Sequence, residues 1–85
     1  MTVVTMRYWA AAKDAAGVPE QSVTADTLAE ALAAVTSSGD RAALRAVLAR
    51  SSFLIDAAPV GRRSPESVQL QDGSVIEVLP PFAGG

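Results

Sequence analysis

Cysteine and histidine are both absent from the 85 residues of this chain. Without a thiol, the chain has no means of forming a disulfide, of holding zinc through sulfur, or of carrying sulfur as a persulfide. Without an imidazole, it lacks the commonest general base and the commonest metal ligand. We therefore expect no metal site, no cofactor bound by this chain, and no self-contained nucleophilic or metal-assisted catalysis.

Basic residues are too few and too scattered for a nucleic-acid-binding surface. The chain has 7 basic and 9 acidic residues, a net charge of −2, and its nearest approach to a basic cluster is Arg62-Arg63. Since nucleic-acid binding requires clustered Lys and Arg that neutralise phosphates, we expect no nucleic-acid partner. No apolar run approaches the ~20 residues of a membrane span, and no signal-peptide pattern opens the chain. The sequence predicts a soluble, cytoplasmic protein with no membrane partner.

Hydrophobic residues make up 49% of the chain. Their pattern predicts a single small domain with a packed core. The aromatic residues Tyr8 and Trp9 are expected to be core or half-buried sheet residues. Residues 59–67 are expected to form a loop, because Pro, Gly, Arg and Ser dominate them. The predicted elements are strands over 3–9, 21–25, 53–55 and 74–79, a helix over 10–16 that stops at Gly17, a helix from Thr27 with a capping box to Glu30, and a further helix capped by Asp40.

The order of these elements predicts an α+β fold with a mixed sheet and its helices packed on one face. The first and last strands are the most apolar, so we expect both at the centre of the sheet. Strands from opposite ends of the chain would then run parallel, which is a β-grasp (ubiquitin-like) layout. We assign residues 1–79 to this domain and residues 80–85 to an extended C-terminal tail.

The tail combines rigidity at its root with a near absence of side chains at its end. Pro80 and Pro81 cannot donate ladder hydrogen bonds, so the last strand must stop there, and they hold the backbone extended. Gly84 and Gly85 follow. A carboxylate that is to be activated must enter the active site of another protein, where a Cβ at the last position would obstruct attack on its carbonyl carbon. We therefore interpret the carboxylate of Gly85 as the reactive group.

Several segments carry a resemblance to a known family. They are Arg7-Tyr8-Trp9-Ala10 with Lys13-Asp14-Ala15-Ala16-Gly17, then Leu70-Gln71-Asp72-Gly73, and Leu79-Pro80-Pro81-Phe82-Ala83-Gly84-Gly85. Together they resemble the MoaD family, the small β-grasp subunits of molybdopterin synthase within the ThiS/MoaD superfamily. Lys13 and Ser74 depart from the family pattern. Asp56 stands where the family often opens a short hairpin with Asn, which leaves the structure of residues 56–70 open.

The resemblance implies a sulfur carrier in molybdenum cofactor biosynthesis, the sulfur-donating and not independently catalytic subunit of a sulfurtransferase. It implies that an activating (MoeB-like) enzyme adenylates Gly85 with ATP and that a separate sulfur donor converts it to a thiocarboxylate. A large (MoaE-like) subunit then receives the tail and passes the sulfur to a pyranopterin precursor. Gly84 keeps the tail narrow and Phe82 anchors its root, and the implied partner contacts are Leu79, Pro80, Pro81, Phe82, Ala83 and Gly84.

Three other readings stay open. The same chemistry serves sulfur carriers for thiamine or cysteine synthesis, although the helix-forming run directly after the first strand and the Pro80-Pro81 pair favour the molybdopterin branch. A ubiquitin-like modifier would instead join Gly85 to a lysine of a target protein. A plain β-grasp interaction module with an idle tail would be indifferent to removal of Gly84 and Gly85.

Overall fold

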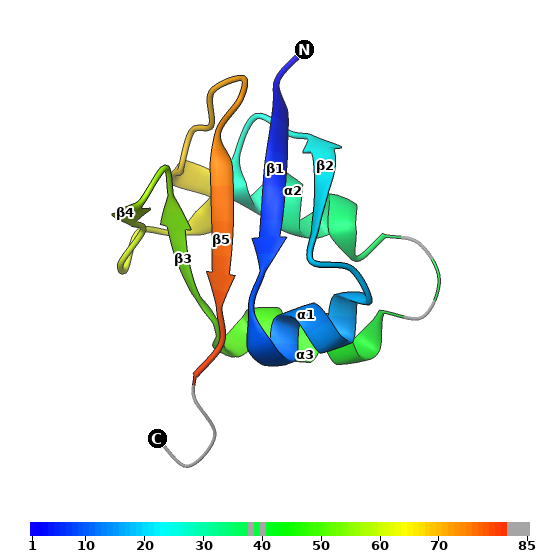
Figure 1. The fold of residues 1–85 in the computed structure, drawn as a ribbon. Coiled ribbons are helices and arrows are strands. Elements are labelled where there is room, and N and C mark those ends of the chain that lie inside the picture. Colours follow the sequence, from blue (N-terminus) through cyan, green and yellow to red (C-terminus); the bar gives the residue numbers. More distant parts are fainter. Residues whose placement is uncertain (38, 40, 82–85) are drawn as a thin grey trace.

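A five-stranded sheet with three α-helices makes up the computed structural model, which describes residues 1–37, 39 and 41–81 (Figure 1). The strands lie in the order β2-β1-β5-β3-β4. The elements are β1 (Val3–Tyr8), α1 (Ala10–Ala16), β2 (Glu20–Thr24), α2 (Leu28–Val35), α3 (Ala42–Arg50), β3 (Ser52–Ile55), β4 (Ala58–Pro59), the 3₁₀ helix η1 (Pro65–Ser67) and β5 (Val75–Leu79).

The first and last strands are neighbours at the centre of the sheet and run parallel, as predicted. The register pairs Met6 with Ile76 and Tyr8 with Val78. The flanking pairs, β1 with β2 and β5 with β3, are antiparallel. A parallel pair needs a long crossover connection, and here almost the whole chain supplies it. The predicted α+β, β-grasp arrangement is thus confirmed.

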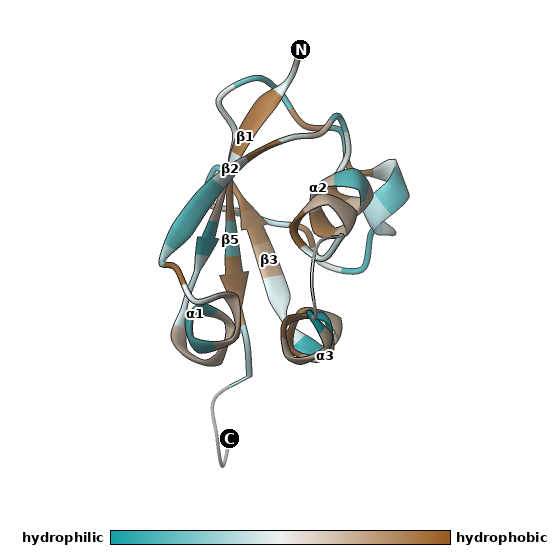
Figure 2. Cartoon of the chain, turned by 90° about the vertical axis from the view of Figure 1, so that its right-hand side faces the viewer, coloured by the Kyte–Doolittle hydropathy of each residue, from teal (hydrophilic) through white to brown (hydrophobic). Residues whose placement is uncertain are grey.

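One face of the sheet carries the core. Alternate residues of the central strands point to it, and five of them are at most 2% exposed: Val4, Met6, Tyr8, Ile76 and Val78. The helices α2 and α3 cover this face, and α1 packs beside α3 at the end where β1 and β5 finish (Figures 1 and 2). Each of the helices α2 and α3 turns one row of apolar side chains toward the same core. The buried residues of these rows are Leu28, Ala31, Val35, Leu44, Val47 and Leu48, and Leu32 is partly exposed. Each buried side chain of this size contributes about 1.5–3 kcal/mol of hydrophobic stabilisation.

The predicted helix ends are found, with one shift at α2. Gly17 ends α1 with a φ of 81°, a left-handed conformation that favours glycine. At the start of α2, the Glu30 N–H donates to the Thr27 hydroxyl at 3.2 Å, as a capping box requires. The Glu30 carboxylate, however, accepts the N–H of Asp26 at 2.8 Å, one residue earlier than the motif predicts. The predicted cap of Asp40 on α3 lies outside the described residues.

The segment from Phe53 to Ser67 differs from its prediction in two ways. The run Phe53-Leu54-Ile55 is a strand as expected, but its side chains are only partly buried, because two-residue β4 is its sole neighbour on the outer side. The predicted loop over 59–67 begins with the last residue of β4 and ends in η1. Arg63 stabilises the turn between them by donating to the Val60 and Pro59 carbonyls at 3.0 and 3.3 Å.

The β3–β4 hairpin turns through only two residues, Asp56 and Ala57, which both have positive φ (50° and 72°). Positive φ at both central residues is what the type I′ hairpin turn requires, and it is why Asn-Gly and Asp-Gly are the preferred pairs. The Asp56 carboxylate accepts the Val75 N–H at 3.0 Å, and the Asp56 N–H donates to the Val75 carbonyl at 2.9 Å. Asp56 therefore fastens the hairpin to the start of β5.

We predict that Ala57→Gly stabilises the protein, because glycine adopts positive φ without the steric cost that alanine incurs. The expected gain in the free energy of unfolding is about 1 kcal/mol. Ala46→Gly, at an exposed position inside α3, is the matched control and is expected to lose about 1 kcal/mol. Urea denaturation of both variants makes the comparison. Equal losses in the two variants would contradict the turn geometry.

Candidate functional site

The described part of the tail begins where β5 ends. Leu79 pairs with Ser52 of β3 and is half-buried. Pro80 is buried, whereas Pro81 is exposed, so the chain leaves the domain between these two residues. Because proline restricts φ and lacks an N–H, neither residue extends the ladder. The remaining predicted site residues, Phe82, Ala83, Gly84 and Gly85, lie outside the described residues.

An exposed aromatic side chain lies beside this exit. Trp9 follows the last residue of β1, one position beyond the Tyr8–Val78 pair, which places it alongside Leu79. It is 47% exposed, and its indole Nε1 donates to Glu77 Oε1 at 3.2 Å. That bond lays the indole across the open face of the sheet. The expectation that both aromatics are core or half-buried sheet residues holds for Tyr8, whereas Trp9 lies just past the strand with nearly half of its surface exposed.

The surroundings of Trp9 mix apolar and charged groups. Register places Leu54 and Arg7 on either side of Glu77, on β3 and β1. Arg7 also approaches Glu20 of β2, with 3.7 Å between Nε and Oε1, and both side chains are about half exposed. An exposed ion pair of this kind contributes little to stability, so this part of the surface is free to exchange its contacts for those of a partner. We call Trp9, Glu77, Leu79 and Pro81 the tail-root surface.

Trp9 is a residue that sequence reasoning missed as a site. The alternation of β1 does place it opposite to Tyr8, on the open face, but alternation alone does not distinguish a half-buried position from an exposed one. Its place next to Leu79 follows only from the parallel register of β1 and β5. An exposed tryptophan is a typical anchor of a protein–protein interface.

Tyr8, directly before Trp9, is not a reactive group. Burial raises the pKa of its phenol to about 12, although the positive charge of Arg41 acts in the opposite direction. The hydroxyl donates to Gln21 Oε1 at 2.9 Å. Tyr8 therefore stays protonated at neutral pH and serves as a core residue with a satisfied polar end.

The described residues offer little chemistry of their own. Across residues 1–37, 39 and 41–81, no group of three or more His, Cys, Asp or Glu side chains is placed to hold a metal ion. In the same part of the chain, every helix is too short or too polar to cross a membrane. Beside the tail root, the described residues instead present an exposed surface around Trp9.

Comparison with known proteins gives one family and several similar folds. The model of the ThiS family matches residues 6–85. No curated protein sequence matches the chain.

Three solved structures illustrate the likeness. Small archaeal modifier protein 1 from Methanosarcina acetivorans has a TM-score of 0.83 and 23% identity, over 100% of this chain and 98% of that one. A chain from the complex of subunits 1 and 2 of molybdopterin-converting factor from Helicobacter pylori has a TM-score of 0.72 and 23% identity, over 99% of this chain and 100% of that one. The corresponding modifier protein from Haloferax volcanii has a TM-score of 0.79 and 18% identity, over 98% and 99%. At these identities the likeness shows the fold.

We predict that the buried Tyr8 phenol makes stability fall at alkaline pH. In the unfolded chain the phenol loses its proton near pH 10, whereas in the folded protein it does so near pH 12. Stability from this group is therefore complete below pH 10 and is lost between pH 10 and 12, by about 2 kcal/mol. Urea denaturation at a series of pH values measures the loss. Tyr8→Phe is expected to flatten this pH dependence, and an equally steep loss in that variant would contradict the assignment.

Proposed function

Because the chain belongs to the ThiS family, we propose that it is a sulfur carrier whose C-terminal carboxylate, on Gly85, is converted to a thiocarboxylate. We further propose that it serves molybdenum cofactor biosynthesis as the small subunit of a molybdopterin synthase. It then donates the sulfur to a pyranopterin precursor in the active site of a large subunit. In this role the chain supplies the sulfur and the partner supplies the catalytic groups.

The observation that carries the proposal is the way the chain leaves the sheet. A central strand ends at Leu79, the buried Pro80 holds the exit in place, and Pro81 is exposed. A strand paired on both sides is a rigid base, and β5 is paired with β1 and β3, so Pro81 is held at a defined position relative to the sheet. Rigid presentation lowers the entropy lost when a partner takes up the tail. Trp9, exposed beside this exit, supplies an apolar surface for the same partner.

Formation of the thiocarboxylate needs two steps, and in both the carboxyl group of Gly85 receives the transferred group, first AMP and then sulfur. In the first, a Gly85 carboxylate oxygen attacks the α-phosphorus of ATP in the activating enzyme, and pyrophosphate leaves. In the second, hydrosulfide supplied by a separate sulfur donor attacks the acyl carbon, AMP leaves as the bond between carbon and the phosphate oxygen breaks, and Gly85 keeps the sulfur as a thiocarboxylate. Since the sequence has no cysteine, the sulfur must come from that donor. The absence of a Cβ at Gly84 and Gly85 lets both attacks reach a narrow active site.

The choice of the molybdopterin branch rests on two local features. Helix α1 follows β1 after a single residue, and the proline pair stands directly before the tail. The proposed partners are a large synthase subunit and an ATP-dependent activating enzyme. The likeness in fold to a subunit of molybdopterin-converting factor is compatible with this branch. The likeness to the archaeal modifier proteins keeps protein conjugation through Gly85 as the competing outcome.

Pyrophosphate exchange into ATP, catalysed by the activating enzyme purified from the same cells, tests the first step. We expect the full chain to support pyrophosphate exchange and the variant that lacks Gly85 to support none. Trp9→Ala is expected to raise the KM for the carrier by about tenfold, because a central aromatic anchor is lost. Val3→Ala, an exposed apolar residue at the other end of β1, is the matched control and leaves the KM unchanged. Undiminished exchange without Gly85 would refute the proposal.

A further inference from the structure

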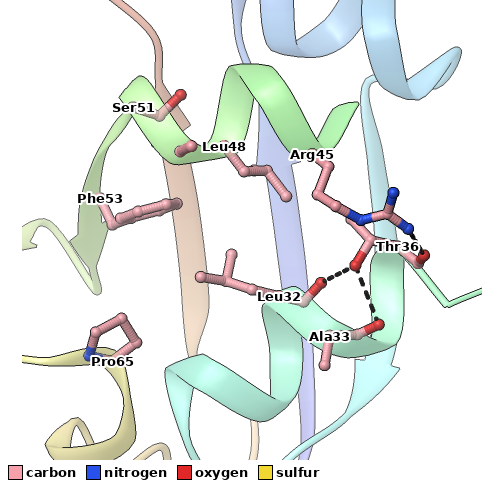
Figure 3. A pocket seen from close by; sticks show the side chains of 9 residues that line it. Leu32, Ala33, Thr36, Arg45, Leu48, Ser51, Phe53 and Pro65 are labelled. Atoms are coloured by element: carbon pink, nitrogen blue, oxygen red, sulfur yellow. Dashed lines mark hydrogen bonds between the residues drawn. The ribbon is translucent and has the colours of Figure 1, made fainter. Parts of the chain in front are cut away.

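Two adjoining cavities lie on the helical side of the molecule, away from the tail-root surface. The first, of about 390 Å³, lies between α2, α3 and the start of β3, and Leu32, Leu48 and Phe53 line it (Figure 3). The second, of about 330 Å³, lies between β3, β4 and the following turn. Both share Ser51, Phe53 and Pro65 in their walls. We call the two together the α2–β4 groove.

The inner wall of the groove is apolar and only partly covered. Leu32 and Phe53 pack against the core but remain partly exposed, and Figure 3 shows them directed toward the same space. This edge of the core stays partly exposed because, beyond β3, the sheet gains only the two residues of β4. The volume of each cavity lies at the lower end of the range of about 300–1,000 Å³ that is typical of ligand-binding clefts.

Each cavity also holds one arginine, and backbone carbonyls fix both. Arg45 lines the first cavity and donates through NH2 to the Thr36 carbonyl at 2.9 Å. Arg63 lines the second and donates to the carbonyls of Val60 and Pro59. A guanidinium has five N–H donors, so each arginine keeps donors for a further acceptor. Their positions are set before any ligand arrives.

No acidic residue lines either cavity, and among the described residues neither arginine forms an ion pair. This is unusual in a chain whose net charge is −2. The imbalance follows from the sequence: Arg41, Arg45 and Arg50 accompany α3, and the next carboxylate after Asp40 is that of Asp56. The groove is therefore a locally positive, apolar site on an acidic protein.

From this combination we propose that the α2–β4 groove docks a peptide segment of a partner protein in which apolar side chains are flanked by acidic residues. The apolar side chains occupy the space over Leu32 and Phe53. The flanking carboxylates accept hydrogen bonds from Arg45 on one side and Arg63 on the other, in the charge-assisted geometry that suits guanidinium groups. Two cations alone are too few for nucleic acid, which requires a row of phosphate contacts.

The inference goes beyond the proposed function and does not depend on it. Trp9 and Glu77 lie on the open face of the sheet, whereas the groove lies on the face covered by α2 and α3. A protein bound in the groove leaves the tail-root surface uncovered. The carrier is thereby able to hold one partner while it presents its tail to another.

An acidic probe peptide tests the proposal on the full chain. The probe has a leucine–phenylalanine pair between two aspartates on each side, and the control peptide has asparagine in place of aspartate. Titration into isotopically labelled protein, followed by amide chemical shifts, is expected to move the signals of Leu32, Arg45, Phe53 and Arg63. We expect the control peptide to bind about tenfold more weakly, since both charge pairs are lost.

Three variants make the test specific. Arg45→Gln is expected to weaken the probe about threefold and to leave the control peptide unaffected. Ala49→Glu places a negative charge in the groove wall and is expected to weaken the probe about tenfold. Ala46→Glu puts the same charge on the same helix outside the groove and serves as the matched control. Chemical shifts of the unliganded variants verify that each is folded.

Three outcomes would overturn the proposal. The first is equal binding of the acidic and asparagine peptides, and the second is probe-induced shifts confined to the tail-root surface. The third is movement of the groove signals on concentrating the protein alone, which would assign the groove to a second copy of this chain. Loss of ATP–pyrophosphate exchange has no bearing on any of the three, so failure here is distinguishable from failure of the proposed function.

Discussion

The parallel pairing of β1 with β5 is the constraint on which the rest of this structure depends. It joins the two ends of the sequence at the centre of the sheet, where Met6, Tyr8, Ile76 and Val78 are buried in the core. Everything between the two strands is then the crossover that a parallel pair requires. Because the pairing also fixes where β5 ends, it sets the point at which the tail leaves the domain.

This pairing divides the surface into two parts with different properties. At the end of the central strands, Trp9 lies exposed beside the last residue of β5, and its indole is held by Glu77. On the helical side, short β4 leaves an apolar groove with Arg45 and Arg63 in its wall. The chain has neither cysteine nor histidine, so in the proposed role other proteins supply the groups for each chemical step. Two separate surfaces give such a chain two places at which to meet them.

Much of the fold followed from local patterns in the sequence. Alternation identified β1 and β5, and Gly17 and Thr27 marked helix ends through their backbone and capping preferences. Local patterns did not predict how the elements lie relative to one another. The exposure of Trp9 depends on its register beside β5, and the partial burial of Phe53 depends on the shortness of β4. Local patterns do not predict the hairpin at Asp56, because the turn pair Asp56-Ala57 lacks the glycine that marks such turns. The roles assigned to Phe82 and to the residues after it remain predictions.

The intact mass of the protein isolated from its native cells under mild conditions tests the central claim most directly. A thiocarboxylate carrier has a population heavier by the difference between one sulfur and one oxygen atom, and deletion of Gly85 removes that population. A mass that stays unmodified after incubation with ATP, a sulfur source and cell extract would contradict the account. Gly85 joined to lysines of other proteins, without a thiocarboxylate population, would contradict it in favour of a protein modifier.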